Sequence, residues 1–114
     1  MNVQIAGRKV VVDDELRDHV NRRLKFAIGR FTKRVAEVRV ALSDVNGPKG
    51  GPDKRCRITL EIIPSGGLMA EETQADLFAA VSGAAERVKH ALKRELERRR
   101  SGRSRARAQA AKAE

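Results

Sequence analysis

The apolar residues of this chain recur with two different periods, and the order of these periods constrains the fold. Apolar and polar side chains alternate over residues 2–8, 37–45 and 55–63, which is typical of strands with one buried face. A short fourth strand is predicted over residues 67–73. Two other segments carry an apolar residue every three to four positions, as helices with one buried face do. The predicted order is therefore β-α-β-β-β-α.

Short polar residues indicate where the two helices begin. Asp13 can accept hydrogen bonds from the free backbone amides of the first helix and so act as its N-cap. Thr73 and Asp76 have the spacing of a capping box before the second helix. The expected apolar stripe of the first helix is Leu16, Val20, Leu24, Ala27 and Phe31, and that of the second is Leu77, Val81, Ala84, Val88 and Leu92.

The connections between these elements predict the topology. A connection that carries a helix joins parallel strands, so the first two strands should be parallel, and the next two connections should be hairpins. The expected fold class is an α/β two-layer sandwich, in which two helices cover one face of a four-stranded mixed sheet. We expect one domain over residues 1–98. Residues 99–114 contain no apolar residue larger than Ala, so they are predicted to form a disordered, basic, Arg/Ala-rich C-terminal tail.

The charge of the chain indicates its class of partner. Its 25 Lys and Arg residues against 15 Asp and Glu residues give a net charge of +10. Such an excess favours a polyanion, most often nucleic acid, over an anionic membrane. The only aromatic residues are Phe26, Phe31 and Phe78, and none of them falls in a predicted strand. We therefore expect contacts to phosphate and to RNA shape rather than base stacking on a sheet.

Basic residues are concentrated on both predicted helices. Between Arg22 and Arg34 no acidic residue interrupts them, which weakens the alternative that they form an ordinary solvated helix face. Phe26 lies beside this cluster, where it can pack on the helix flank or stack on a base. The predicted RNA-binding residues are Arg22, Arg23, Lys25, Arg30, Lys33, Arg34, Arg87, Lys89, Lys93 and Arg94.

The stretch NGPKGGPD, residues 46–53, is the main candidate for a phosphate-binding loop. Such a loop needs a helix N-terminus after it, whereas a strand is predicted here. The favoured interpretation is a turn between two strands. The alternative is that Lys49, Lys54 and Arg55 contact a backbone phosphate.

No residue pattern supports catalysis or a bound cofactor. His19 and His90 have no neighbour at metal-ligand spacing, and Cys56 falls among inward-facing strand residues. A lone cysteine favours a reducing compartment. We find no apolar run of signal-peptide or membrane-span length, so we expect a soluble, cytoplasmic protein that is not an enzyme and takes no small-molecule substrate.

Three stretches of residues 1–96 resemble a known family. They are Leu16-Arg17 through Val20 with Arg22-Arg23-Leu24, then Phe31, and most specifically AEETQADLFAAV at residues 70–81. These stretches are similar to the ribosome hibernation-promoting factors, also called ribosome-associated inhibitor A or sigma-54 modulation proteins. The resemblance implies the same β-α-β-β-β-α fold.

The resemblance also implies a function. Members bind the small ribosomal subunit in the channel for mRNA and tRNA, contact ribosomal RNA through basic helix residues, and block translation in starved or stationary-phase cells. We expect the chain to correspond to the short form of the family, without the second domain of the long members, and to be monomeric when free. Whether it also pairs ribosomes stays open. The alternatives are a general RNA- or DNA-coating protein and a protein–protein adaptor that uses the exposed sheet face.

Overall fold

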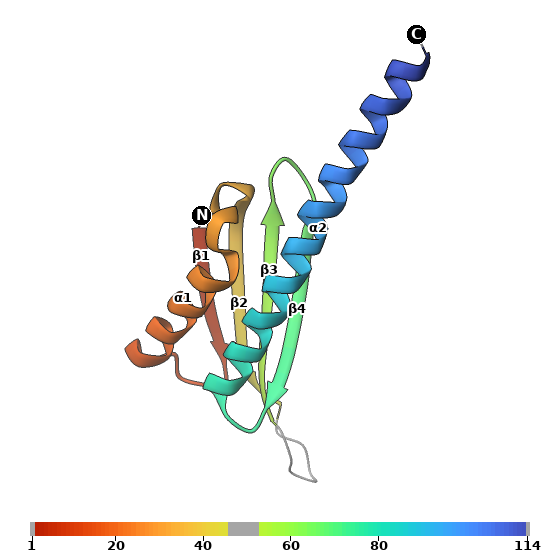
Figure 1. Cartoon of the computed structure of the whole chain (residues 1–114). Coiled ribbons are helices and arrows are strands. Elements are labelled where there is room, and N and C mark those ends of the chain that lie inside the picture. Colours follow the sequence, from red (N-terminus) through yellow and green to blue (C-terminus); the bar gives the residue numbers. More distant parts are fainter. Residues whose placement is uncertain (1, 46–52, 114) are drawn as a thin grey trace.

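The computed structural model describes residues 2–45 and 53–113 and has the predicted order of elements (Figure 1). Two α-helices and a short 3-10 helix accompany four strands. The elements are β1 (Asn2–Arg8), α1 (Asp14–Ile28), the 3-10 helix η1 (Gly29–Arg34), β2 (Val35–Asp44), β3 (Lys54–Ile62), β4 (Gly67–Gln74) and α2 (Leu77–Ala113).

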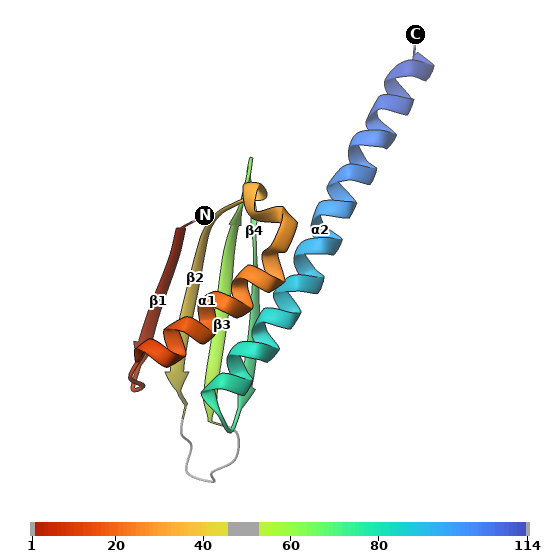
Figure 2. The ribbon, with the colours of Figure 1, turned by 60° about the vertical axis from the view of Figure 1, so that its left-hand side comes forward.

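The four strands form one mixed sheet in the order β1-β2-β3-β4. β1 and β2 are parallel, with α1 in the connection between them, whereas the β2–β3 and β3–β4 pairs are antiparallel. Both helices lie on the same face of the sheet, as the two views show (Figures 1 and 2). The predicted two-layer sandwich is confirmed.

The hydrophobic core lies between the sheet and the two helices. Val38 and Val40 of β2 are in register with Leu60 and Ile58 of β3, so these side chains share the covered face. All four are at most 2% exposed. The helices contribute most of the predicted stripes, although Leu77 and Phe31 are only half-buried. The most deeply buried helical residues are Val20, Leu24, Ile28, Ala80, Val81, Ala84, Val88 and Leu92.

Both helices begin at an aspartate that accepts a hydrogen bond from a backbone amide. The cap of the first helix was predicted correctly, whereas the capping box predicted for the second helix is wrong. The Oδ1 atom of Asp13 accepts a hydrogen bond from the Leu16 amide at 2.8 Å, so the predicted N-cap of α1 is confirmed. At α2 the cap is Asp76, whose Oδ2 accepts from the Ala79 amide at 3.2 Å. Thr73 is not part of a capping box, because it lies in β4 and pairs with Arg55 of β3. The pairing of Thr73 within the sheet therefore takes precedence over the capping pattern in the sequence.

The first helix ends before Phe31. Gly29 follows α1 with φ of 50°, a conformation that glycine adopts without strain, and its amide donates to the Lys25 carbonyl. The chain then continues as η1, where Phe31 packs against the core as a half-buried residue.

The second helix extends well beyond the sheet (Figures 1 and 2). Its last buried side chain is Leu96. The predicted disordered tail differs from the structure in one respect, because α2 continues as helix to Ala113. Ala, Arg, Gln and Lys are good helix formers, so the composition of these residues favours a helical backbone. The boundary between a domain of residues 1–98 and a tail of 99–114 stays a prediction.

Candidate nucleic-acid interface

A shallow groove lies on α1 beside α2, and cationic and aromatic side chains line it. His19, Arg22, Arg23 and Phe26 of α1 line it, and it measures about 290 Å³. The ammonium group of Lys89 on α2 lies over the ring of Phe26, 5.0 Å from its centroid. Phe26 is 67% exposed, so it does not belong to the core. These five residues are called the inter-helix groove below.

His19 fixes the relative position of the two helices. Its Nε2 atom lies 3.1 Å from the Phe78 carbonyl oxygen and 3.2 Å from Ser82 Oγ, both on α2. The His19 and Phe78 rings also pack together, with centroids 4.9 Å apart. The imidazole therefore serves as a link between the helices at one end of the groove. Across residues 2–45 and 53–113, no group of three or more His, Cys, Asp or Glu side chains could hold a metal ion.

The cations of η1 have different environments. Arg30 and Lys33 are exposed, and the Arg30 guanidinium lies 5.0 Å from the centroid of the Phe31 ring. Arg34 is half-buried, and its Nε donates to the Ile63 carbonyl at 3.1 Å while the Ile63 amide donates to the Arg34 carbonyl at 2.8 Å. Arg34 therefore joins η1 to the end of β3. The predicted RNA contact of Arg34 therefore involves a side chain that also binds the Ile63 carbonyl.

On α2 the predicted residues lie on opposite flanks. Lys89 faces α1, whereas Arg87 faces β4 and its Nε donates to Glu72 Oε2 at 2.8 Å. This hydrogen bond lowers the pKa of Glu72, so the carboxylate stays charged at neutral pH. The close approach of Glu72 to the helix depends on Gly83, since a Cβ atom there would lie 2.6 Å from Glu72 Cγ. The charge of Arg87 is thus largely compensated.

The remaining α2 residue on the β4 side is Arg94. It lines a hollow of about 390 Å³ together with Leu68, Ala91, Glu95 and Arg98. Arg87, Arg94 and Arg98 are called the β4 flank below. The predicted cations thus lie in three places, which are the inter-helix groove, the η1 region and the β4 flank.

The exposed cations around the groove have no acidic partners nearby. Within the part of the chain that the structure describes, Arg22, Arg23, Lys25, Lys33 and Lys93 form no ion pair. The open face of the sheet is different, because there Arg39 pairs with Glu37, and both Arg55 and Arg57 pair with Glu71. Uncompensated positive charge is therefore concentrated on the helical side of the molecule.

The stretch NGPKGGPD joins two antiparallel strands, as the turn interpretation requires. Lys49 and the rest of residues 46–52 lie outside the described residues. At the base of the connection, the Val45 amide donates to the Asp53 carbonyl at 2.7 Å. Lys54 Nζ lies 3.0 Å from Asp44 and 3.4 Å from Asp53, and the hydrogen bond to Asp44 is the main reason that the pKa of Lys54 is raised. Lys54 is thus engaged by carboxylates.

Cys56 is confirmed as a core residue. Its side chain is fully buried between the sheet and the helices, and burial raises the pKa of the thiol to about 12. A thiol that stays protonated at neutral pH is a poor nucleophile.

Sequence reasoning missed one functional candidate, Arg99. It belongs to the run Arg98-Arg99-Arg100, of which Arg99 and Arg100 were assigned to the predicted tail. The structure places Arg99 beside Arg30 and Arg34, in a pocket between η1 and α2. The dense run of arginines was the available signal, but only the structure shows that Arg99 and Arg100 line this pocket, whereas Arg98 lines a different hollow.

Comparison with known protein families gives one match that covers nearly the whole domain. The family model described as "Sigma 54 modulation protein / S30EA ribosomal protein" matches residues 3–100.

Two curated proteins are similar in sequence. The ribosome hibernation promotion factor of Deinococcus radiodurans is 30% identical over 94 residues, which is 80% of this chain and 47% of that protein. The chloroplastic ribosome-binding factor PSRP1 of Spinacia oleracea is 32% identical over 79 residues, which is 68% of this chain and 26% of that protein. The chain therefore spans about half of the first relative and about a quarter of the second.

Two solved structures are similar in fold. The N-terminal domain of Thermus thermophilus Protein Y superimposes with a TM-score of 0.68 at 30% identity, over 82% of this chain and 98% of that one. A ribosomal subunit interface protein from Coxiella burnetii gives a TM-score of 0.72 at 15% identity, over 85% of this chain and 99% of that one. At this low identity the second likeness concerns the fold alone.

Proposed function

The chain belongs to the sigma 54 modulation protein / S30EA ribosomal protein family, and on this premise we propose that it is a ribosome-associated translation inhibitor. It binds the small ribosomal subunit by contacting ribosomal RNA through the helical side of the domain. Bound there, it occupies the channel for mRNA and tRNA in starved or resting cells. The protein acts by occlusion rather than by catalysis, in the cytoplasm and together with the ribosome.

The observation that carries this proposal is the inter-helix groove. Arg22 and Arg23 are exposed on α1 and have no carboxylate partner within the described residues. They are free to bind phosphates, and each phosphate contact releases condensed counterions from the RNA. Phe26 lies between them and Lys89, with its ring 67% exposed. An exposed aromatic ring next to cations suits an unstacked base as well as the RNA backbone.

The other predicted contacts surround the groove and contribute unequally. Lys25, Arg30, Lys33 and Lys93 are exposed cations that extend the positive surface. Arg94 continues it onto the β4 flank. Arg87 contributes less, because Glu72 already neutralises it. Arg34 contributes through the part of its guanidinium that does not bind Ile63.

The open face of the sheet is the weaker alternative for RNA. Its cations Arg39 and Arg57 are each held by a glutamate, so binding RNA there would first require breaking ion pairs. This contrast offers a matched control, because Arg8 and Arg39 are exposed on the sheet side and can receive the same change of charge as Arg22 and Arg23.

The test compares two double variants, Arg22→Glu/Arg23→Glu and Arg8→Glu/Arg39→Glu. Both change the net charge equally, and none of the four residues is buried. Co-sedimentation with purified small subunits and inhibition of translation in vitro are measured for each. We expect the groove variant to lose both activities and the sheet variant to keep them.

The outcomes also separate ribosome binding from general coating of nucleic acid. Binding to small subunits should survive an excess of tRNA or duplex DNA, whereas a coating protein would be removed by either competitor. If the folded groove variant inhibits translation at wild-type concentrations, the inter-helix groove is not the binding site.

A further inference from the structure

A second cationic site lies between η1 and the C-terminal part of α2. It is an open pocket of about 390 Å³, within the range of roughly 300–1,000 Å³ that is common for ligand pockets. Four arginines line it, against a single glutamate. The lining residues are Arg30, Phe31, Arg34, Leu96, Glu97, Arg99 and Arg100.

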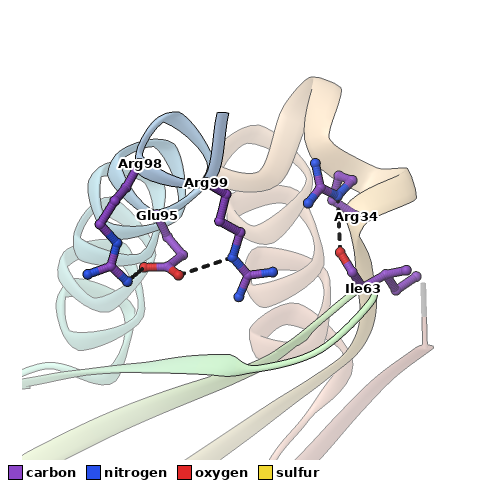
Figure 3. Close-up of polar contacts among 5 residues, drawn as sticks. All are labelled: Arg34, Ile63, Glu95, Arg98 and Arg99. Atoms are coloured by element: carbon purple, nitrogen blue, oxygen red, sulfur yellow. Dashed lines mark hydrogen bonds and ion pairs between the residues drawn. The ribbon is translucent and has the colours of Figure 1, made fainter. Parts of the chain in front are cut away.

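Arg34 lines this pocket and carries one unpaired donor. Its Nε donates to the Ile63 carbonyl, which fixes the plane of the guanidinium (Figure 3). Its Nη2 is buried from solvent and has no hydrogen-bond partner among the described residues. A buried donor without a partner is costly, and in native proteins such groups are usually satisfied by protein, water or a bound ion. Arg34 therefore marks a position where an acceptor is missing.

Arg99 is held in place from two sides. Its Nε lies 3.1 Å from Glu95 Oε1, and its side chain is only 23% exposed. Its Nη2 lies directly over Gly66 in the β3–β4 turn, because a Cβ atom at Gly66 would be 2.7 Å from it. Figure 3 shows that Arg34 comes from η1 and Arg99 from α2. Both side chains line the same pocket, so positive charge from two elements is concentrated there.

Glu95 does not supply that anion. Its carboxylate is shared by Arg98 and Arg99, whose hydrogen bonds lower its pKa, and it lies on the α2 side of Arg99 (Figure 3). Glu97 also lines the pocket but forms no ion pair with the described residues. Positive charge therefore remains in excess between η1 and α2.

We propose that this η1–α2 pocket binds a phosphate group. The planar, multi-donor guanidinium matches the oxygens of phosphate in a bidentate manner, and Arg34 and Arg99 are both preorganised by protein contacts. Arg30 and Arg100 add charge at the rim. The phosphate belongs either to an RNA backbone or to a free phosphate ion. The inference goes beyond translation inhibition, since binding of inorganic phosphate needs no ribosome.

The full-length chain provides a closely matched pair of variants for the test. Arg98 and Arg99 are adjacent on α2 and both pair with Glu95, but only Arg99 lines the pocket. Arg99→Gln removes the proposed phosphate ligand, and Arg98→Gln removes the same charge outside the pocket. Arg100→Gln, at an exposed position on the pocket rim, serves as a second variant whose fold is not at risk.

The first probe is inorganic phosphate. The thermal midpoint is measured in about 10 mM phosphate and in chloride of equal ionic strength, because a ligand that binds only the folded state raises the midpoint. We expect phosphate to raise it in the wild type and in Arg98→Gln, and to raise it less in Arg99→Gln and Arg100→Gln. A general salting-out effect of phosphate would be the same in all four proteins.

The second probe is a short single-stranded RNA without a terminal phosphate. If the pocket takes a backbone phosphate, the slope of log affinity against log salt should be smaller by about 0.7 in Arg99→Gln than in Arg98→Gln. A response that depends on Arg99 to either probe supports the site and identifies the source of the phosphate. If Arg99→Gln and Arg100→Gln match Arg98→Gln with both probes, the pocket does not bind phosphate, and the proposed ribosome binding through the inter-helix groove is unaffected.

Discussion

The ammonium group of Lys89 lies 5.0 Å from the centre of the Phe26 ring and so connects α2 to α1 across the inter-helix groove. Cation–π contacts at exposed positions contribute about 0.5–1 kcal/mol. The contact holds an aromatic face and a cation at a fixed separation, next to Arg22 and Arg23. The side chains of the groove are therefore positioned by contacts within the protein itself.

This contact can be measured by a double-mutant cycle. Phe26→Leu keeps an apolar side chain but loses the aromatic ring, and Lys89→Met keeps the length but loses the charge. We expect the two changes to couple by about 0.5–1 kcal/mol in the free energy of unfolding measured by urea denaturation. A coupling indistinguishable from zero would mean that the two side chains do not interact in solution.

The cations of the groove should determine the salt dependence of binding. Arg22→Ala and Arg23→Ala each remove one phosphate contact, so each should reduce the slope of log affinity against log salt by about 0.7–0.9. The measurement is a titration of small subunits or of their RNA at several salt concentrations. Arg39→Ala on the sheet face is the control and should leave the slope unchanged. Equal slopes for all three variants would remove the groove from the binding surface.

The Arg87–Glu72 pair should stabilise the fold in a pH-dependent manner. The pKa of Glu72 is lowered in the folded state from an ordinary value of 4.5, chiefly by the hydrogen bond from Arg87. The unfolded state then binds more protons near that pH, so this stabilisation is present above pH 4.5 and is lost as the pH falls through the folded pKa. We expect Arg87→Met to be less stable than the wild type at pH 7.

Urea denaturation across the acidic range checks this expectation. The difference in stability between Arg87→Met and the wild type should shrink as Glu72 becomes protonated in both proteins. A difference that stays constant with pH would show that the effect of the substitution comes from lost packing instead.

Residues 101–114 should add little to the stability of the domain. Among the side chains that the structure describes, Leu96 is the last buried one of α2, so we expect the core to remain intact when residues 101–114 are deleted. We expect the thermal midpoint to stay nearly unchanged and RNA affinity to fall modestly through lost counterion release. Leu96→Ala is the positive control, because truncation of a buried leucine costs about 2–5 kcal/mol. A midpoint that falls as far on deletion as in Leu96→Ala would show that the tail is packed.

The Cys56 thiol should be unreactive toward thiol reagents in the native protein. Its thiol is buried, and its pKa is raised to about 12 by that burial. We expect a thiol reagent at pH 8 to label Cys56 fully in denaturant and only at the rate of unfolding in native buffer. Rapid labelling of the folded protein would indicate a reactive cysteine and reopen the question of a redox role.

The sequence by itself determined the elements and which of their faces are buried. Val38, Val40 and Leu42 alternate with polar residues, and successive side chains of a strand point to opposite faces, so the covered face of β2 follows from the pattern. Asp13 was also predictable, because an N-cap binds an amide only three positions ahead. The resemblance of the first helix and of residues 70–81 to a known family led to the family that the comparison shows.

Only the tertiary structure decided how the functional side chains are grouped. Glu72 pairs with Arg87, Ile63 binds Arg34, and Phe26 meets Lys89, and each pair comes from two elements that are distant in sequence. Such contacts depend on how far each helix is rotated and where it crosses the sheet, which local periodicity does not specify. The predicted capping box was wrong because of another contact between elements. Thr73 belongs to β4 and pairs with Arg55 of β3. Local patterns are set by neighbours along the chain, whereas the division of the cations into a groove, a pocket and a flank is set by packing between elements.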